Sequence, residues 1–242
     1  MRGKILLVDD DRTLREDFKL WFEDFDVLGA ENAEEALAIL GKPNEIDVVI
    51  MDVEMPGMDG LAALERIKAS SPDKPVIIMT GYSTKDVAVH ALQARADNYI
   101  EKPFDLKTMH AAIEKVLPPG HGGGRPGEMD LAAKIDHVRW FLEGNCFKKI
   151  TLGDAARTVY MTPKYLSRAF RSKTGMGFNE YRLKVKMAQA KKLLRTTGLS
   201  VKQVSVKLGY ANAESFIRQF EKIAGAAPSS YRKQQKPLKR RK

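Results

Sequence analysis

The sequence predicts two domains of different fold class, an α/β domain followed by an all-α domain. Within residues 1–117, short apolar runs alternate with amphipathic segments, a pattern typical of a doubly wound parallel sheet with helices on both faces. Beyond residue 128 the apolar spacing is helical, and residues 151–175 recur in similar form as residues 200–225. The two parts also differ in charge, which supports a division into two bodies.

The charge changes sign near residue 118. Residues 1–118 contain 14 Lys and Arg against 23 Asp and Glu, a net charge of −9, whereas residues 119–242 carry +19. Residues 118–127 are rich in Gly and Pro and have no apolar periodicity, which predicts a flexible linker. We therefore expect an acidic domain at 1–117, a basic domain at 128–234 and a basic tail at 235–242, which is either solvated or in contact with phosphates.

Composition excludes several classes of protein. With 43% hydrophobic and 30% charged residues, the chain can bury a core and is not intrinsically disordered. Its apolar runs are far shorter than the ~20 residues of a membrane-spanning helix, and its start lacks the pattern of a secretory signal. The single cysteine, Cys146, permits no internal disulfide. We expect a cytoplasmic protein with no membrane partner.

Each element of the acidic domain is expected from its own apolar pattern. Buried strands are predicted at 4–8, 46–51, 76–79 and 98–100, with a weaker strand at 26–29. Amphipathic helices are predicted at 13–22, 33–40, 61–69, 84–92 and 106–116. Ligands of such sheets bind at the carboxyl ends of the strands, where we look for a site.

Polar residues follow four of these strands. Asp9 and Asp10 come after the first strand, Asp52 after the third, Thr80 after the fourth and Lys102 after the fifth. Three carboxylates repel one another unless they share a cation, and hard oxygen ligands favour Mg²⁺. A carboxylate there can attack phosphorus, while a hydroxyl and an ammonium stabilise the transferred oxygens.

Each of these residues also has a purely structural explanation, as a helix cap, a turn hydroxyl or a solvated charge. Together they favour a site, and the segments that contain them resemble the receiver domain of bacterial response regulators. The resemblance covers about residues 2–117. The matching segments are VDDD at 8–11, MDVEMPGMDG at 51–60, MTGY at 79–82 and NYIEKPF at 98–104.

The resemblance implies a role for each matching residue. It makes Asp52 the acceptor of a phosphoryl group from a phosphohistidine on a sensor histidine kinase. It also implies a flavodoxin-like sheet of order 2-1-3-4-5 and a cis peptide bond between Lys102 and Pro103. The other implied roles are Mg²⁺ binding by Asp9, Asp10, Asp52 and the main-chain carbonyl of Glu54, phosphate contact by Thr80 and Lys102, and switching by Thr80 and Tyr99.

A phosphatase of the haloacid dehalogenase type is the alternative, because such enzymes combine Asp, Thr or Ser, Lys and an acidic pair. In that family the nucleophile follows the first strand and a second Asp stands two residues later. Here Asp52 follows the third strand and position 54 is Glu. The chain order therefore favours a receiver, and we expect no enzymatic activity beyond self-phosphorylation and dephosphorylation.

The repeated segment of the basic domain predicts two helix-turn-helix units. In each copy a short helix precedes a turn and a second helix, which begins after Thr162 in one copy and after Asn212 in the other. Residues 178–196 are predicted to join the units as a helix. In a segment of charge +19, paired units of this kind indicate double-stranded DNA binding rather than RNA binding or a helical bundle with a solvated basic face.

The basic domain resembles the AraC-type DNA-binding domain over residues 128–234. The matching segments are LGDAA at 152–156, MTPKYLSRAF at 161–170, LGY at 208–210, ESF at 214–216 and PSSYR at 228–232. The sequence departs from that family at Ser205, where Ala is usual, and at Lys186, where Arg is usual. Both are small changes that bear on the expected packing and leave the assignment unchanged.

The two predicted recognition helices differ in charge. If Leu166 and Phe170 face the core, the first helix exposes four residues in one stripe and the second exposes a corresponding stripe. The predicted DNA-contacting residues are Lys164, Ser167, Arg168 and Arg171 in the first, and Glu214, Ile217 and Arg218 in the second. The first helix carries a net +4 and is expected to anchor; the second is neutral and is expected to discriminate.

Taken together, the sequence predicts a transcription factor switched by phosphorylation. Phosphate can act only by favouring one receiver surface over another. We expect this surface to drive homodimerisation; the alternative is that the acidic receiver masks the basic domain until activation. RNA polymerase is a possible further partner.

Overall fold

The computed structural model describes residues 3–81, 84–117 and 129–235. The chain forms two compact units, Met1–Lys134 and Ile135–Lys242. The predicted linker at 118–127 lies outside the described residues, as does the tail beyond Gln235. Among the described residues, no helix combines the length and the apolar character needed to span a membrane.

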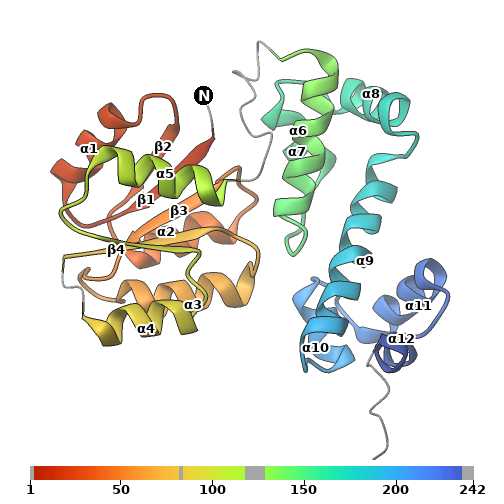
Figure 1. Cartoon of the computed structure of the whole chain (residues 1–242). Coiled ribbons are helices and arrows are strands. Elements are labelled where there is room, and N and C mark those ends of the chain that lie inside the picture. Colours follow the sequence, from red (N-terminus) through yellow and green to blue (C-terminus); the bar gives the residue numbers. More distant parts are fainter. Residues whose placement is uncertain (1–2, 82–83, 118–128, 236–242) are drawn as a thin grey trace, which may run out of the picture. The chain divides into compact units, whose positions relative to one another are not determined.

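The first unit is built on a five-stranded parallel sheet of order β2-β1-β3-β4-β5 (Figure 1). This confirms the predicted doubly wound fold and strand order. The strands are β1 (Lys4–Val8), β2 (Asp26–Ala30), β3 (Val48–Asp52), β4 (Val76–Thr80) and β5 (Asn98–Glu101).

Strand β3 begins two residues later than predicted and includes Asp52. Ile46 is buried, but its carbonyl accepts a hydrogen bond from Lys74 Nζ and pairs with no neighbouring strand. The apolar run therefore indicated burial and not strand pairing. The sequence had suggested that Asp52 and Thr80 follow their strands. In the structure they are instead the last residues of β3 and β4.

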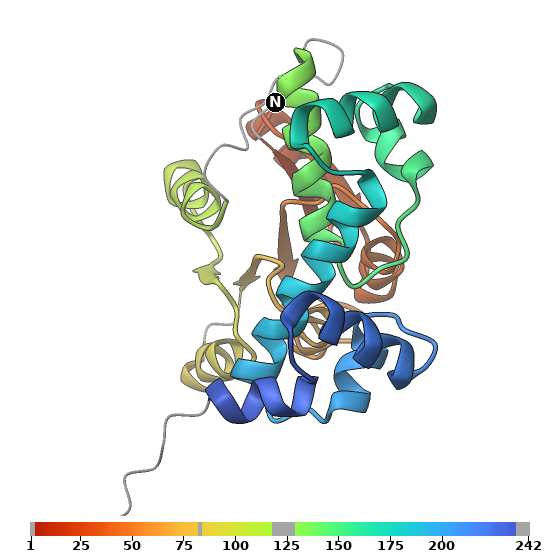
Figure 2. The same ribbon diagram turned by 90° about the vertical axis from the view of Figure 1, so that its right-hand side faces the viewer.

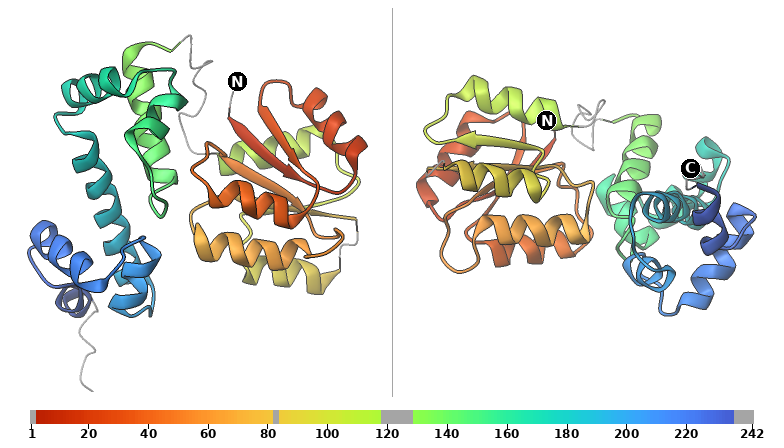
Figure 3. Two further views of the ribbon diagram at one scale, coloured as in Figure 1. Left: turned by 180° about the vertical axis from the view of Figure 1, so that it is seen from behind. Right: turned by 60° about the horizontal axis from the view of Figure 1, so that its bottom comes forward.

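Helices cover both faces of the sheet (Figures 1 and 3). Successive strand residues point to opposite faces, so Leu6 packs on the side of α2, α3 and α4 and Leu7 packs on the side of α1 and α5. The helices are α1 (Arg12–Trp21), α2 (Ala33–Gly41), α3 (Gly60–Ser70), α4 (Lys85–Gln93) and α5 (Leu106–Val116). Their first turns begin after polar caps: Asp11 accepts hydrogen bonds from the N–H groups of Thr13 and Leu14 at the start of α1.

The second unit is entirely helical over its described residues. Its helices are α6 (Leu131–Gly144), whose first four residues precede the boundary of the unit, α7 (Leu152–Thr158), α8 (Pro163–Thr174), α9 (Phe178–Thr196), α10 (Val201–Lys207), α11 (Ala213–Ala224) and α12 (Pro228–Gln235). Figure 2 shows the long α9 running from the group α6–α8 to the group α10–α12, as predicted for residues 178–196. Helices α6 and α12 were not predicted individually, although α6 buries Ile135, Val138 and Leu142 at helical spacing.

The internal repeat extends over three helices in each copy. Phe170 of α8 meets Tyr181 of α9 edge to face, with ring centroids 5.4 Å apart, and Phe220 of α11 meets Tyr231 of α12 in the same way at 5.5 Å. The hydrogen bonds are equivalent too: Arg182 donates to the carbonyl of Ile150, and Arg232 donates to that of Leu199. Each acceptor directly precedes the cap of a unit's first helix, so an arginine from the third helix fixes the start of each unit.

Candidate functional site

The carboxyl ends of β1 and β3 carry an acidic cluster. These strands are neighbours, with Val8 paired to Met51, so Asp9 and Asp52 come next at the same edge of the sheet. Carboxylate oxygens of Asp9, Asp10 and Asp52 lie within 4.8 Å of one another. Asp9 and Asp52 are buried, whereas Asp10 is exposed. The structure therefore brings Asp52 next to the adjacent pair Asp9 and Asp10, which lies more than 40 residues earlier in the sequence.

Lys102 bridges two of these carboxylates from the end of β5. Its Nζ donates to Asp9 Oδ2 and to Asp52 Oδ2, at 2.7 Å in each case. Burial raises the pKa of Asp9, and the hydrogen bond and charge of Lys102 offset only part of this increase. Burial alone would lower the pKa of Lys102, but its hydrogen bonds to Asp52 and Asp9 outweigh that effect and raise the pKa above its usual value. The ammonium is thus a shared counterion for the buried pair.

Thr80 and Tyr99 lie on the neighbouring strands. Thr80 is fully buried, and its carbonyl accepts a hydrogen bond of 2.8 Å from the N–H of Lys102. Tyr99 is half-buried and packs against the core cluster that contains Ala91 of α4. The Lys102–Pro103 peptide bond is cis, as the sequence analysis predicted. The switching roles of Thr80 and Tyr99 stay predictions.

The loop after β3 approaches Asp52 closely. The backbone N–H of Glu54 donates to Asp52 Oδ1 at 3.3 Å, so the Glu54 backbone lies next to the cluster; the metal-binding role of its carbonyl stays a prediction. A Cβ on Gly60, the first residue of α3, would lie only 2.0 Å from the carbonyl oxygen of Asp52. Only glycine allows α3 to begin this close to the strand end.

Arg15 is a site residue that sequence reasoning missed. Its Nη1 donates to the main-chain carbonyl of Asp9 at 2.6 Å, which ties α1 to the loop that carries the acidic residues. The side chain also packs against Gly29 of β2, where a Cβ would lie 3.3 Å from Arg15 Cδ. A cation one turn after an acidic run is a signal that could have identified it.

The donor set of this cluster suits a divalent cation. Two buried carboxylates and one exposed carboxylate offer hard oxygen ligands at the carboxyl ends of β1 and β3. The exposed Asp10 leaves the cluster open to solvent. Lys102 already neutralises part of the same negative charge. A cation and this ammonium would therefore compete for the same oxygens.

In the second unit, α8 presents the predicted basic stripe. Thr162 caps the helix by accepting from the N–H of Tyr165, with Pro163 at the first helical position. Leu166 and Phe170 are fully buried, as predicted. The opposite face is exposed and consists of Lys164, Ser167, Arg168 and Arg171.

The corresponding helix α11 differs in one residue from the predicted stripe. Asn212 caps it by accepting from the N–H of Ser215, and Glu214 and Arg218 are exposed. Ile217 is only half-exposed, because it packs against the hydrophobic cluster around Phe216. Helical spacing alone placed Ile217 on the outer face, whereas the packing of the unit covers part of it.

The turns of the two units reveal a further exposed aromatic residue. In the turn of the first helix-turn-helix unit, Tyr160 has a φ of 51° and is 78% exposed. The equivalent residue in the second helix-turn-helix unit is Gly209, with a φ of 74°. A tyrosine in the left-handed region is unusual, and its side chain projects into solvent next to α8. Tyr165, on α8 itself, is also exposed. Neither residue was among the predicted contacts.

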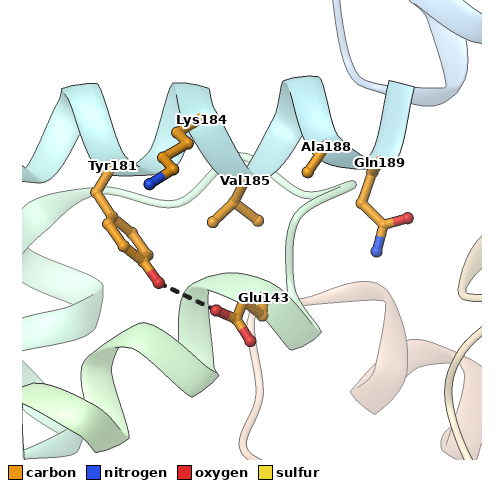
Figure 4. A pocket seen from close by; sticks show the side chains of 6 residues that line it. All are labelled: Glu143, Tyr181, Lys184, Val185, Ala188 and Gln189. Carbon is orange, nitrogen blue, oxygen red and sulfur yellow. Dashed lines mark hydrogen bonds between the residues drawn. The ribbon is translucent and has the colours of Figure 1, made fainter. Parts of the chain in front are cut away.

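Helix α9 is anchored to α6 through Tyr181. The Tyr181 hydroxyl donates to Glu143 Oε1 and accepts from Arg139 Nε, each at 3.1 Å. Figure 4 shows the bond to Glu143 at one end of a cavity of about 310 Å³, which is also lined by Lys184, Val185, Ala188 and Gln189. The first half of α9 is thereby fixed to α6, the helix that precedes the first helix-turn-helix unit.

Comparison with protein families matches both units. Residues 5–114 match the response regulator receiver domain, and residues 155–234 match a helix-turn-helix domain. The fold and the acidic cluster define the first unit as a receiver. The first unit is thus similar to receiver domains and the second contains a segment similar to helix-turn-helix domains, in the order that the sequence predicted.

Two curated proteins are similar to part of this chain. The DNA-binding transcriptional regulator NtrC of Salmonella typhimurium is 42% identical over 123 residues, which cover 48% of this chain and 25% of that protein. The response regulator MprA of a Mycobacterium species is 34% identical over 143 residues, which cover 57% of this chain and 62% of that protein. The chain thus spans less than two thirds of either relative.

Among solved structures, a response regulator receiver domain protein from Clostridium thermocellum is similar to this chain. The identity is 37%, the TM-score is 0.45, and the match covers 47% of this chain and 93% of that one.

Proposed function

We propose that this protein is a cytoplasmic two-component response regulator that binds promoter DNA when Asp52 is phosphorylated. One observation carries the proposal: Lys102 bridges Asp9 and Asp52 at the strand ends of a receiver that shares its chain with two exposed recognition helices. The phosphoryl donor is a phosphohistidine on a sensor histidine kinase.

The proposed reaction is a single phosphoryl transfer. A carboxylate oxygen of Asp52 attacks phosphorus, a P–O bond forms, and the P–N bond to the histidine breaks. Lys102 and the Thr80 hydroxyl then hold the phosphoryl oxygens, which carry the charge that develops. The proposed chemistry is confined to phosphorylation and dephosphorylation of Asp52.

Asp9, Asp10, Asp52 and the main-chain carbonyl of Glu54 are the proposed ligands of Mg²⁺. When bound, the cation neutralises the negative charge of the carboxylates and of the incoming phosphoryl group. The burial of Asp9 supports this role, because it raises the pKa of that carboxyl and so makes its charge costly without a cation.

Phosphorylation can be tested with acetyl phosphate and Mg²⁺. We expect wild type to gain the mass of one phosphoryl group and Asp52→Asn to gain none. Asp59→Asn is the matched control, since Asp59 is an exposed cap at the start of α3 outside the cluster, and it should be labelled like wild type. Label on Asp52→Asn would contradict the assignment of the acceptor.

DNA binding is assigned to α8 and α11. The exposed cations of α8 are placed to neutralise phosphates and to read base edges, while α11 offers Glu214, Ile217 and Arg218 with no net positive charge. Sites selected from random DNA, with and without beryllofluoride, would test the link between the two domains. An identical yield of sites in both states would contradict phosphorylation-dependent binding.

We propose homodimerisation through the receiver as the consequence of phosphorylation, with unmasking of the basic domain as the competing mechanism. Light scattering of the full chain with and without beryllofluoride separates them. A doubling of the mass supports dimerisation, whereas a constant mass with increased DNA affinity supports unmasking.

A further inference from the structure

Two cations on one face of α9 are each bonded to a different helix-turn-helix unit. Arg182 and Lys186 are four residues apart and therefore lie one above the other on the helix. Arg182 donates to the carbonyl of Ile150, directly before α7 of the first unit. Lys186 Nζ donates at 2.8 Å to the carbonyl of Leu208, at the end of α10 of the second unit. Within one helical turn, α9 thus holds the backbone of both units.

The loop that precedes the first helix-turn-helix unit touches the second unit at this point. Phe147, in the loop before α7, packs against the hydrophobic cluster of the second unit, and Lys207 Nζ lies 5.7 Å from its ring centroid. A Cβ on Gly209, in the turn of the second unit, would lie 3.7 Å from both Lys186 Nζ and the carbonyl oxygen of Phe147. Lys186 therefore lies at the junction where the loop before the first unit meets the turn of the second.

The burial of Lys186 shows that this contact has an energetic cost. Burial lowers the pKa of Lys186, and the nearby charge of Arg182 lowers it further. Two like charges one turn apart do not stabilise an isolated helix. The ammonium is compensated by the Leu208 carbonyl and by the ring of Tyr210, whose centroid is 5.6 Å away. Both partners belong to the second unit, so the stabilisation depends on how that unit is placed.

We propose that Lys186, together with Arg182, is a positioning residue that sets the distance and rotation between the two recognition helices and so the spacing of the two DNA subsites. This inference rests on the proposed DNA-binding function. Inserting one base pair between two subsites shifts the second by about 3.4 Å and rotates it by about 35°. A rigid junction cannot follow such a change, whereas a loosened junction can.

The test uses full-length protein activated with beryllofluoride and Mg²⁺, and a site selected from random DNA with the wild type. Footprinting locates the two contacted segments, and derivatives carry one base pair more or fewer between them. We expect wild type to lose about tenfold or more in affinity on each derivative, as for a base-pair mismatch. We expect Lys186→Met to lose only about threefold, because the second unit can reorient.

Lys186→Arg is the conservative control and should keep the narrow preference of wild type, because a guanidinium can also donate to the Leu208 carbonyl. Arg182→Met tests the other end of the junction and should broaden the preference in the same way. Thermal unfolding of each variant identifies those that are folded. If Lys186→Met or Arg182→Met is folded and has the same spacing preference as wild type, the proposal is overturned.

The salt dependence of binding distinguishes positioning from direct DNA contact. If Lys186 contacted a phosphate, Lys186→Met would weaken binding equally at every spacing and reduce the salt slope by about one. That result would also overturn the proposal. If wild type itself selects no DNA sites, the proposed function fails first; if wild type binds and its spacing preference is unaltered in the variants, only the present inference fails.

Discussion

Replacing Lys102 by Met is expected to destabilise the first domain by about 3 kcal/mol in the absence of Mg²⁺. The ammonium lies 2.7 Å from one oxygen of Asp9 and 2.7 Å from one oxygen of Asp52, and the Asp9 side chain is 1% exposed. Removing one partner of a buried pair costs about 3–5 kcal/mol, and the 23% exposure of Lys102 favours the lower value.

Mg²⁺ should restore most of this loss. A ligand at 100 times its Kd stabilises the folded state by about 2.7 kcal/mol, and in the Met variant no ammonium competes for the carboxylates. Wild type should gain less from the same Mg²⁺ concentration, because Lys102 must release at least one carboxylate oxygen. Mg²⁺ should therefore raise the free energy of unfolding of Lys102→Met more than that of wild type.

The pH dependence has a definite sign. Because the pKa of Asp9 is raised in the folded protein, the stability contributed by its neutral form is complete below the ordinary carboxyl pKa of 3.8 and is lost as the pH rises through the folded pKa. Without Lys102 this loss becomes larger. The deficit of the Met variant should thus be greatest near neutral pH and shrink in acid.

Urea unfolding followed by tryptophan fluorescence can measure these effects. In a Trp140→Phe background, Trp21 is the only tryptophan and reports on the first domain alone. Lys19→Met is the control, since its ion pair with Glu16 is exposed and its loss should have no measurable effect. Equal Mg²⁺ stabilisation of wild type and Lys102→Met would refute the role of Lys102 as shared counterion.

Four further outcomes are expected. Gly60→Ala should destabilise the first domain by about 2 kcal/mol or more and slow labelling by acetyl phosphate, because its Cβ would lie 2.0 Å from the Asp52 carbonyl; normal labelling and stability would contradict this. Burial lowers the pKa of Lys74 to about 8, so wild type should gain about 3 kcal/mol relative to Lys74→Met between pH 8 and 10.5, measured by urea unfolding; a constant difference would exclude a buried charge. Arg168→Ala should weaken DNA binding by about 1–3 kcal/mol if it reads guanine, and equal affinities for guanine and non-guanine sites after substitution are the signature. Glu214→Ala should change the ranking of operator variants in a competition assay, and an unchanged ranking would exclude discrimination by this residue.

Local patterns were sufficient for most of the fold. The strands and helices of the receiver follow from apolar periodicity, and the starts of α8 and α11 follow from Thr162 and Asn212, whose side chains bond to backbone N–H groups three residues later. Ile46 shows the limit of such patterns. It is as apolar and buried as a strand residue, yet its carbonyl bonds to Lys74, 28 residues away.

The sequence by itself determined which residues could form the acidic site, because the carboxyl ends of parallel strands meet at one edge of the sheet. Only the tertiary structure decided that Lys102 bonds to both Asp9 and Asp52, that Gly60 lies against the Asp52 backbone, and that Lys186 reaches the second helix-turn-helix unit. The physical reason is the separation along the chain of the residues that interact. Periodicity and caps express interactions within a few residues, whereas these contacts join segments that are brought together only when the chain packs.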